Sequence, residues 1–320
     1  MRLARLLAFL AALLLPLQVL GQAYPAKPIR LVVPWTAGGV TDALSRVVAQ
    51  AMSESMGQQV VIENRPGAGG TIGMTLVAKA AADGYTLVAT DLPSHAISAT
   101  LYSKLPYDVL GEFEPVGMIA GSPMVLATNP AFGAKTFPEF IRLVKANPGK
   151  FSYASSGNGS ITHLAIERLK RELDLDMVHV PYKGTIPAIQ SVLAGDAIVA
   201  FGTIPGVLPH AKAGKLVMLG NSFARRFDQI PDVPPIADHA PGFDMAFYTA
   251  MLAPAKTPRE ILNRLHAELS KAFAQQKVKD VFAASVAEPG SMNPSQLQEY
   301  MTQEVKVWGD VVRAVGLKVD

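Results

Sequence analysis

The chain contains no cysteine among its 320 residues. Disulfides, thiolate metal sites and a lipid-anchored cysteine are therefore excluded. Its six histidines are scattered without the spacing of metal ligands. A large excess of either charge is also missing, since 29 Lys and Arg stand against 26 Asp and Glu with no basic run, which argues against a nucleic-acid partner. We expect neither a metal nor a cofactor.

Several enzyme motifs are missing as well. No Gly-x-x-x-x-Gly-Lys-Ser/Thr loop is present, and GNGSITH, residues 157–163, lacks the third glycine of a Gly-x-Gly-x-x-Gly fingerprint. Ser160 is not in a Gly-x-Ser-x-Gly elbow and lies where a helix N-cap belongs. The sequence predicts that the protein is not an enzyme. A hydrolase using Ser160 with His163 is the catalytic alternative, and turnover of an ester would reveal it.

The first 23 residues have the parts of a secretory signal peptide. Arg2 and Arg5 form a basic start, Leu6 to Leu15 is apolar, and small residues lead to Ala23. The apolar run is shorter than the ~20 residues needed to span a bilayer. We expect export with cleavage after Ala23, which leaves a nearly neutral mature chain.

Two α/β lobes are predicted from the pattern of apolar runs. Short buried-strand runs alternate with amphipathic stretches from Ile29 onward, which is typical of βαβ units around a parallel sheet. The pattern begins with a strand near 29–35 and a helix over 41–56, and it returns with a strand at 151–155 and a helix over 161–173. A length of 320 residues fits about two domains. We assign residues 24–122 and 225–320 to lobe I and residues 123–224 to lobe II.

Near the C-terminus, two further helices are predicted. Thr257 to Glu260 fits a capping box with Thr257 as the N-cap, and residues 294–315 form a last helix whose Trp308 packs against a lobe.

Two turns of small residues each connect a predicted strand to the start of a predicted helix. The first amides of a helix have no intrahelical partners, and the helix dipole adds roughly half a positive charge there, so each turn can bind an anion. Neither turn contains Lys or Arg, so we expect directed hydrogen bonds that suit a planar carboxylate in a cleft between the lobes. The opposing interpretation is a tight connection that merely uses glycine. The candidate ligand-binding residues are Trp35, Thr36, Ala37, Gly38, Gly39, Thr41 and Asp42 in the first turn, Ser155, Ser156, Gly157, Asn158, Gly159 and Ser160 in the second, and Thr90 and Thr203 on the cleft walls.

Two of these residues have alternative roles that the sequence leaves open. Asp42 can accept amides of its own helix, fix the loop shape or meet a ligand ammonium group. Trp35 can form an apolar wall for the ligand, as can Tyr248, or pack in the core.

Seven stretches, in order and with ordinary spacing, resemble the Bug family, the substrate-binding proteins of tripartite tricarboxylate transporters. They are YPAKPIRLVVPWTAGGVTDALSR, VVIENRPGAGGTIG, DGYTLV, YASSGNGSITHLAIE, HVPYKGTIPAI, PDVPPIAD and LAPAKTPREILNRL. The resemblance runs from about Tyr24 to the C-terminus.

This resemblance implies a periplasmic, monomeric receptor with a two-lobe Venus flytrap fold, similar to the type II periplasmic binding proteins, and no catalysis. It implies a ligand that is a mono-, di- or tricarboxylate, an aromatic acid or an acidic amino acid, and delivery to transmembrane permease subunits. Pro34 to Asp42 and Ser155 to Ser160 match the loops that grip the ligand through main-chain amides and ordered waters.

Departures from the family pattern leave the ligand open. DVLGEFEPVG is a loose version of a family segment, NSFARR replaces a more usual Val-Thr or Val-Ser pair before Arg, and Tyr248 and Met251 stand where Trp and Leu are usual. A sensor that reports ligand to a signalling partner is a further alternative, which neighbouring permease or kinase genes would distinguish.

Overall fold

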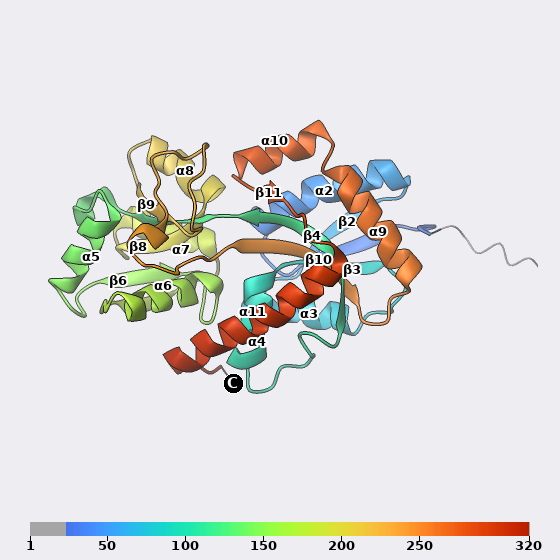
Figure 1. Ribbon diagram of the computed structural model, residues 1–320, viewed down its shortest axis with the longest axis horizontal. Coiled ribbons are helices and arrows are strands. Elements are labelled where there is room, and N and C mark those ends of the chain that lie inside the picture. Colours follow the sequence, from blue (N-terminus) through green and yellow to red (C-terminus); the bar gives the residue numbers. More distant parts are fainter. Residues whose placement is uncertain (1–23, 320) are drawn as a thin grey trace, which may run out of the picture.

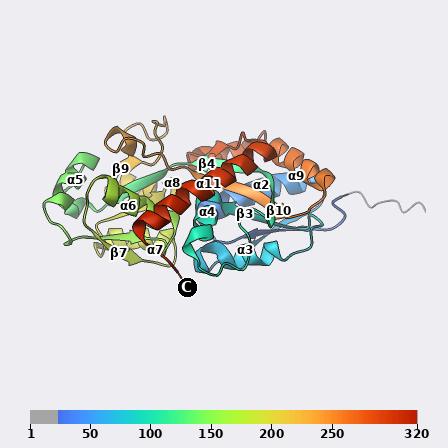
Figure 2. The same ribbon diagram turned by 60° about the horizontal axis from the view of Figure 1, so that its bottom comes forward.

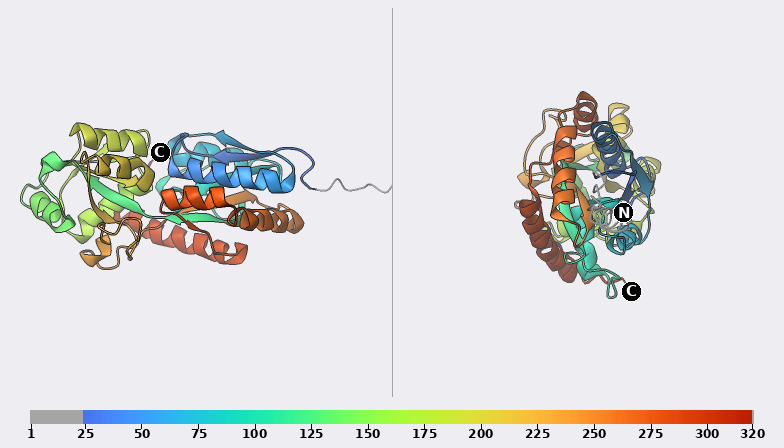
Figure 3. Two further views of the ribbon diagram at one scale, coloured as in Figure 1. Left: turned by 90° about the horizontal axis from the view of Figure 1, so that it is seen from above. Right: turned by 90° about the vertical axis from the view of Figure 1, so that its right-hand side faces the viewer.

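The structure is a computed structural model that describes residues 24–319, so the predicted signal segment lies outside the described residues. Two mixed β-sheets with helices packed around them form two lobes, as predicted (Figure 1). Figure 3 shows that the two bodies lie end to end along the longest axis of the molecule.

The first lobe is built on a six-stranded sheet with the order β11-β4-β10-β3-β1-β2. Its strands are β1 (Ile29–Val33), β2 (Val60–Asn64), β3 (Thr86–Asp91), β4 (Phe113–Ser122), β10 (Phe247–Pro254) and β11 (Glu288–Pro289). Its helices are α2 (Val40–Met56), α3 (Thr71–Ala78), α4 (Leu92–Leu101), α9 (Arg259–Ala272), α10 (Gln276–Ala284) and α11 (Pro294–Val315), with a short 3₁₀ helix η1 (Ala68–Gly70).

The second lobe is built on a five-stranded sheet with the order β7-β6-β8-β5-β9. Its strands are β5 (Met124–Thr128), β6 (Ser152–Ser155), β7 (Val178–Pro181), β8 (Val199–Thr203) and β9 (Val217–Asn221). Its helices are α5 (Phe137–Lys145), α6 (Ile161–Glu172), α7 (Thr185–Ala194) and α8 (Ile204–Lys212), with 3₁₀ helices η2 (Pro130–Phe132) and η3 (Ile236–Asp238).

The two sheets share one plan. In each, three parallel strands lie in the order second, first, third, and an antiparallel strand follows. That antiparallel strand is the first one after the chain crosses between lobes, β5 on the way out and β10 on the way back. Because parallel strands end at the same edge of a sheet, the turns after β1 and β3, and those after β6 and β8, share an edge.

The strand β1 shows why the buried strands are continuous apolar runs. Ile29, Leu31 and Val33 pack in one hydrophobic cluster, and Val32 packs in a second cluster on the opposite face of the sheet. A strand covered on both faces is mostly apolar, which explains the four apolar residues of IRLVV, while the half-buried Arg30 pairs with Glu63 of β2.

The helix α11 packs against both lobes (Figure 2). It begins with a capping box, in which Asn293 accepts from the amide of Gln296 and the Gln296 side chain accepts from the Asn293 amide. Met301 packs in a first-lobe cluster. Trp308 packs in a cluster that includes Phe201 of the second lobe, so its predicted packing against a lobe is confirmed.

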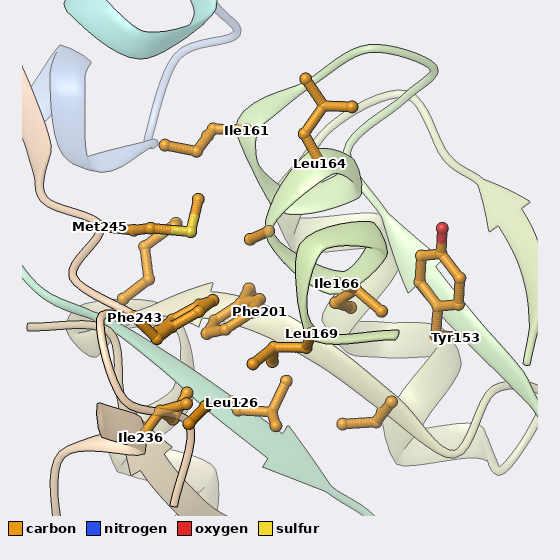
Figure 4. Packing of buried hydrophobic residues seen from close by; sticks show 14 of the residues in the cluster. Leu126, Tyr153, Ile161, Leu164, Ile166, Leu169, Phe201, Ile236, Phe243 and Met245 are labelled. Carbon is orange, nitrogen blue, oxygen red and sulfur yellow. The ribbon is translucent and has the colours of Figure 1, made fainter. Parts of the chain in front are cut away.

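Residues 225–246 pack mainly on the second sheet. Figure 4 shows Phe243 and Met245 beside Phe201 of β8, and the Phe243 and Phe201 rings stack with centroids 6.2 Å apart. Phe227 packs in another cluster of the second lobe. The assignment of lobes remains a proposal, and these contacts favour a second boundary near residue 246 in place of 224.

The predicted capping box at Thr257 is wrong. The Thr257 hydroxyl donates to the Pro254 carbonyl at 2.7 Å, and no side chain accepts from the first amides of the helix. The helix α9 therefore begins at Arg259, with Pro258 at the N-cap and no side-chain cap.

Candidate functional site

The two predicted glycine turns each follow a parallel strand, and the two lobes approach each other beside them. A Cβ added to Gly184, at the start of α7, would lie 3.8 Å from Thr36 Oγ1 in the first lobe. One added to Gly159 would lie 1.9 Å from Leu101 Cδ2 of α4. The first turn therefore lies close to the second lobe, and the second turn lies close to the first lobe.

Asp42 holds the first turn in shape. Its Oδ2 accepts from the Gly38 amide at 2.9 Å and from Arg46 Nε at 2.9 Å, and its Oδ1 accepts from Asn64 Nδ2 at 2.8 Å. Asn64 Nδ2 also donates to the Trp35 carbonyl at 3.1 Å. Of the roles left open for Asp42, these contacts support fixing the loop, since Gly38 precedes the helix.

The charge of Asp42 is neutralised locally. Burial alone would raise the pKa of this carboxyl, but the hydrogen bonds from Arg46, Gly38 and Asn64 outweigh burial, so its pKa is lowered. The carboxylate is therefore ionised and paired with Arg46, and it does not oppose an anion at the helix start.

The N-terminus of α2 is open. Gly39 is its N-cap in an extended conformation (φ −73°, ψ 168°), and no side chain caps the helix. Thr36, Ala37 and Gly38 are exposed, whereas Thr41 is buried. The first amides of α2 are thus available to a ligand that reaches the exposed loop.

The second turn differs, because its own side chains occupy most of its amides. The amides of Ser156, Gly157 and Gly159 donate to Thr162 Oγ1 (2.9 Å), Ser155 Oγ (3.1 Å) and His163 Nδ1 (3.0 Å), respectively. The Ser160 hydroxyl accepts from the His163 amide at 3.3 Å as the predicted N-cap. Asn158 is exposed at the tip. The second turn is therefore a prefolded surface that leaves few amides for a ligand.

A stacked pair of histidines packs against the second turn and contacts its residues. The rings of His163 on α6 and His179 on β7 lie 3.7 Å apart and nearly parallel, and Tyr153 stacks on His179 at 4.9 Å. Ser155 Oγ and His179 Nε2 are 2.6 Å apart. Burial lowers the pKa of the His179 imidazole to about 4, and burial together with the neighbouring His179 lowers that of His163 to about 4. Both rings are therefore neutral at pH 7, and for His163 the amide of Gly159 donating to Nδ1 requires this nitrogen to carry no proton.

These contacts do not support a hydrolase that uses Ser160 with His163. Within residues 24–319, Ser160 Oγ donates to the Gly157 carbonyl at 2.8 Å and no hydrogen bond joins it to an imidazole ring. A nucleophile needs its base within hydrogen-bond reach.

The remaining candidates lie at other places. Thr90 is buried, and its side chain is on the opposite face of the sheet from that of Asp91. Thr203 is the N-cap of α8 without a side-chain cap. Trp35 is partly buried and packs against the first-lobe core, and a Cβ on Gly70 would lie 3.3 Å from its ring.

Sequence reasoning missed Gly184 and Leu101, and it placed Asp91 only within a predicted cleft-wall stretch, Thr90 to Ser98, without singling it out. Gly184 ends a strand-to-helix turn of the same kind as the two selected turns, so the pattern was a usable signal. Asp91 caps α4 by accepting from the Ser94 amide at 2.9 Å, and an Asp two residues before Pro93 indicates such a cap.

Neither a metal centre nor a membrane span is found in the described part of the chain. Residues 24–319 contain no group of three His, Asp or Glu side chains suited to a metal ion. None of their helices is long and apolar enough to cross a bilayer.

Two lobes joined by crossing strands, with an open helix N-terminus where they meet, define the architecture of solute-binding receptors. The family model for the tripartite tricarboxylate transporter family receptor matches residues 44–317, and the chain belongs to this family. The protein BugT of Bordetella pertussis is 35% identical over 325 residues and the match covers 100% of both chains, which confirms the resemblance to Bug proteins.

Two similar solved structures contain ligands. R. palustris Rpa4515 with adipate has a TM-score of 0.87 and 31% identity, covering 92% of this chain and 99% of that chain. MatC (Rpa3494) from Rhodopseudomonas palustris with bound malate has a TM-score of 0.83 and 32% identity, covering 90% of this chain and 100% of that chain.

Replacing Asp42 should loosen the first turn. In Asp42→Asn the new side-chain NH₂ group would replace an oxygen that accepts hydrogen bonds from the surrounding N–H groups. We therefore expect a loss of about 1–3 kcal/mol of unfolding free energy at pH 7. Because the folded pKa is lowered, this contribution is complete above the unfolded value of about 3.9 and disappears as pH falls through the folded value. Urea unfolding at pH 7 and pH 2.5 measures both effects.

The matched control is Asp310→Asn, which removes an exposed Asp–Arg pair and should change stability by less than about 1 kcal/mol. Equal stability of Asp42→Asn and wild type at pH 7 would contradict the role given to Asp42.

Replacing His163 should test the support of the second turn. His163→Phe leaves the Gly159 amide buried without an acceptor and should cost about 1–3 kcal/mol, whereas His163→Gln offers an oxygen and should recover part of that loss. Because the folded pKa of about 4 is below the unfolded value of about 6.5, wild-type stability should fall as pH is lowered between these values. Urea unfolding from pH 4.5 to 7.5 should give a shallower slope for both variants, and an unchanged slope would refute the assignment of a neutral buried His163.

Proposed function

We propose that the protein is an exported periplasmic receptor that binds a small carboxylate between its lobes and delivers it to the permease of a tripartite tricarboxylate transporter. The observation that carries this proposal is the uncapped N-terminus of α2, preceded by an exposed loop that lies close to the second lobe. No catalytic step is proposed.

The carboxylate would sit against the first amides of α2, where the helix dipole favours an anion. Asp42 and Arg46 hold the loop while cancelling each other's charge, so backbone dipoles provide the attraction. The prefolded second turn and Gly184 would close over the ligand from the second lobe.

Lobe closure would couple binding to delivery. A ligand that touches both lobes binds the closed state better than the open state and shifts the population toward it. Thr36 lies close to Gly184 and Leu101 lies close to Gly159, which supports a ligand contact from both lobes at this place. A permease could then recognise the closed form.

The relatives support the ligand class. The bound molecules named for two similar receptors, adipate and malate, are both carboxylates. The signal-like segment that ends at Ala23 supports export, and the family supports the permease as the partner of a monomeric receptor.

The proposal is tested by thermal unfolding of ligand-free mature protein against mono-, di- and tricarboxylates, aromatic acids and amino acids. A ligand at ~100 times its dissociation constant should add about 2.7 kcal/mol of stability. A selective rise with one class of carboxylate supports the receptor. The absence of any rise across the panel would overturn the proposal.

A charge placed at the N-cap of α2 should abolish binding. Gly39 has a φ of −73° and an added Cβ would meet only the Thr36 carbonyl at 3.7 Å, so larger residues fit. In Gly39→Asp the new carboxylate would cap the free amides itself and repel a ligand anion, so we expect at least a hundredfold loss of affinity with unchanged or higher stability. Calorimetric titration with the best ligand of the panel measures this.

Gly39→Ala is the matched control, because it adds a Cβ without charge. It should keep affinity within about tenfold of wild type. Equal affinities of Gly39→Asp and Gly39→Ala would place the site elsewhere.

A further inference from the structure

Unpartnered buried polar atoms gather on one face of the first sheet. Among residues 24–319, five buried side-chain atoms have no hydrogen-bond partner: Trp35 Nε1, Ser45 Oγ, His95 Nδ1, Ser122 Oγ and Thr249 Oγ1. Buried polar groups are almost always paired, so each exception needs an explanation. All of these except His95 belong to the face of the sheet covered by α2.

The strand register brings three polar side chains to this face. Asp91 of β3 lies directly opposite Thr249 of β10, and Ser122 of β4 lies opposite Phe247, two residues from Thr249. Opposite residues and residues two apart point to the same face, so Asp91, Thr249 and Ser122 form a diagonal row. The face is that of Met251, which packs with Leu44 of α2.

Trp35 and α2, which carries Ser45, pack on the same face of the sheet as this row. Ser45 is fully buried on α2, which contacts β3 and β4. Trp35 packs against the same cluster, and it begins the exposed loop of residues 36–38. The polar row therefore lies at the inner end of the loop that we propose binds a carboxylate.

Asp91 is a buried acid without a cationic partner. It is 1% exposed and accepts from the Ser94 amide at 2.9 Å, and no ion pair joins it to the described Lys, Arg or His residues. Burial raises its pKa to about 6, although the Ser94 hydrogen bonds and the Trp35 indole favour its charged form. The Trp35 N–H points toward the carboxylate but does not reach regular hydrogen-bond geometry.

We propose that Asp91, Trp35 and Thr249 form a subsite that binds a hydrogen-bond-donating group, an ammonium or a hydroxyl, carried next to the carboxylate of the ligand. The ligand class is then an amino or hydroxy carboxylate. This inference rests on the proposed function and adds the part of the ligand that the α2 amides do not contact.

The chemistry of the row fits such a donor. The Asp91 carboxylate can only accept, and the hydroxyl groups of Ser122 and Thr249 can accept or donate. An ammonium would compensate a charge that is otherwise buried alone, and a hydroxyl could donate to Asp91 while accepting from the Trp35 indole. A second carboxylate at the same place would be repelled by Asp91.

The test compares matched ligands by calorimetric titration at pH 7.5. The series are propionate, lactate and alanine; succinate, malate and aspartate; and glutarate, 2-hydroxyglutarate and glutamate. Wild-type protein should bind the amino or hydroxy member of at least one series at least tenfold more tightly than the plain member. A preference for the amino member identifies the group as an ammonium, and a preference for the hydroxy member identifies it as a hydroxyl.

Two variants assign that preference to the subsite. Asp91→Asn keeps an oxygen that can accept the Ser94 amide, so the cap of α4 survives while the charge is removed. It should reduce the preference at least tenfold and leave the affinity for the plain carboxylate equal or higher. Thr249→Val removes one hydroxyl at constant shape and should reduce the preference by about threefold or more. The matched control is Asp108→Asn. Asp108 is in the same lobe, and its exposed carboxylate also accepts hydrogen bonds from backbone amides.

Four results would overturn the inference. The plain carboxylate can bind best in wild type, in which case the receptor function stands and the subsite is refuted. The preference for the amino or hydroxy ligand can remain unchanged in both Asp91→Asn and Thr249→Val, which refutes the assignment to Asp91. An equal loss of this preference in Asp108→Asn refutes it as well. Binding of no member of any series, nor of the wider carboxylate panel, refutes the proposed function together with the inference.

Discussion

The open first turn of α2 is the feature on which the candidate site depends. Its amides stay free because Gly39 supplies no side-chain cap, and the loop in front of them keeps its shape because Asp42 ties Gly38 to the helix. A buried carboxylate at this place would normally oppose an anion. Arg46 Nε lies 2.9 Å from Asp42 Oδ2 and neutralises this negative charge. The short segment therefore combines an attractive backbone dipole with a rigid loop.

The two lobes contribute unequally to the site. The first turn has free amides, whereas the second turn satisfies the amides of Ser156, Gly157 and Gly159 from within and rests on the neutral His163. A prefolded surface loses little conformational entropy when a ligand arrives. We infer that the first lobe supplies most of the anion attraction and that the second lobe supplies a fixed shape for closure.

The sequence alone predicted the parts of this fold that depend on local patterns. Buried parallel strands such as β1 are apolar at most positions, and α11 begins and ends at the predicted residues because its pattern and caps agree. The support of the second turn by stacked rings could not be predicted, since His179 arrives from β7 and only the fold stacks it on His163. The environment of Asp91 could not be predicted for the same reason, because β10 brings Thr249 opposite to it from far along the chain.

The unpartnered groups near Asp91 also bear on how closure could depend on the ligand. A buried donor or acceptor without a partner costs about 1–3 kcal/mol, and Ser122, Thr249 and the Trp35 indole are all in this position. An empty closed form would therefore be disfavoured relative to one in which polar ligand atoms complete these contacts. Binding energy gained only in the closed form is what shifts a two-state receptor. On this argument, the buried row that we propose as a subsite would also favour the closed form only when ligand atoms complete its contacts.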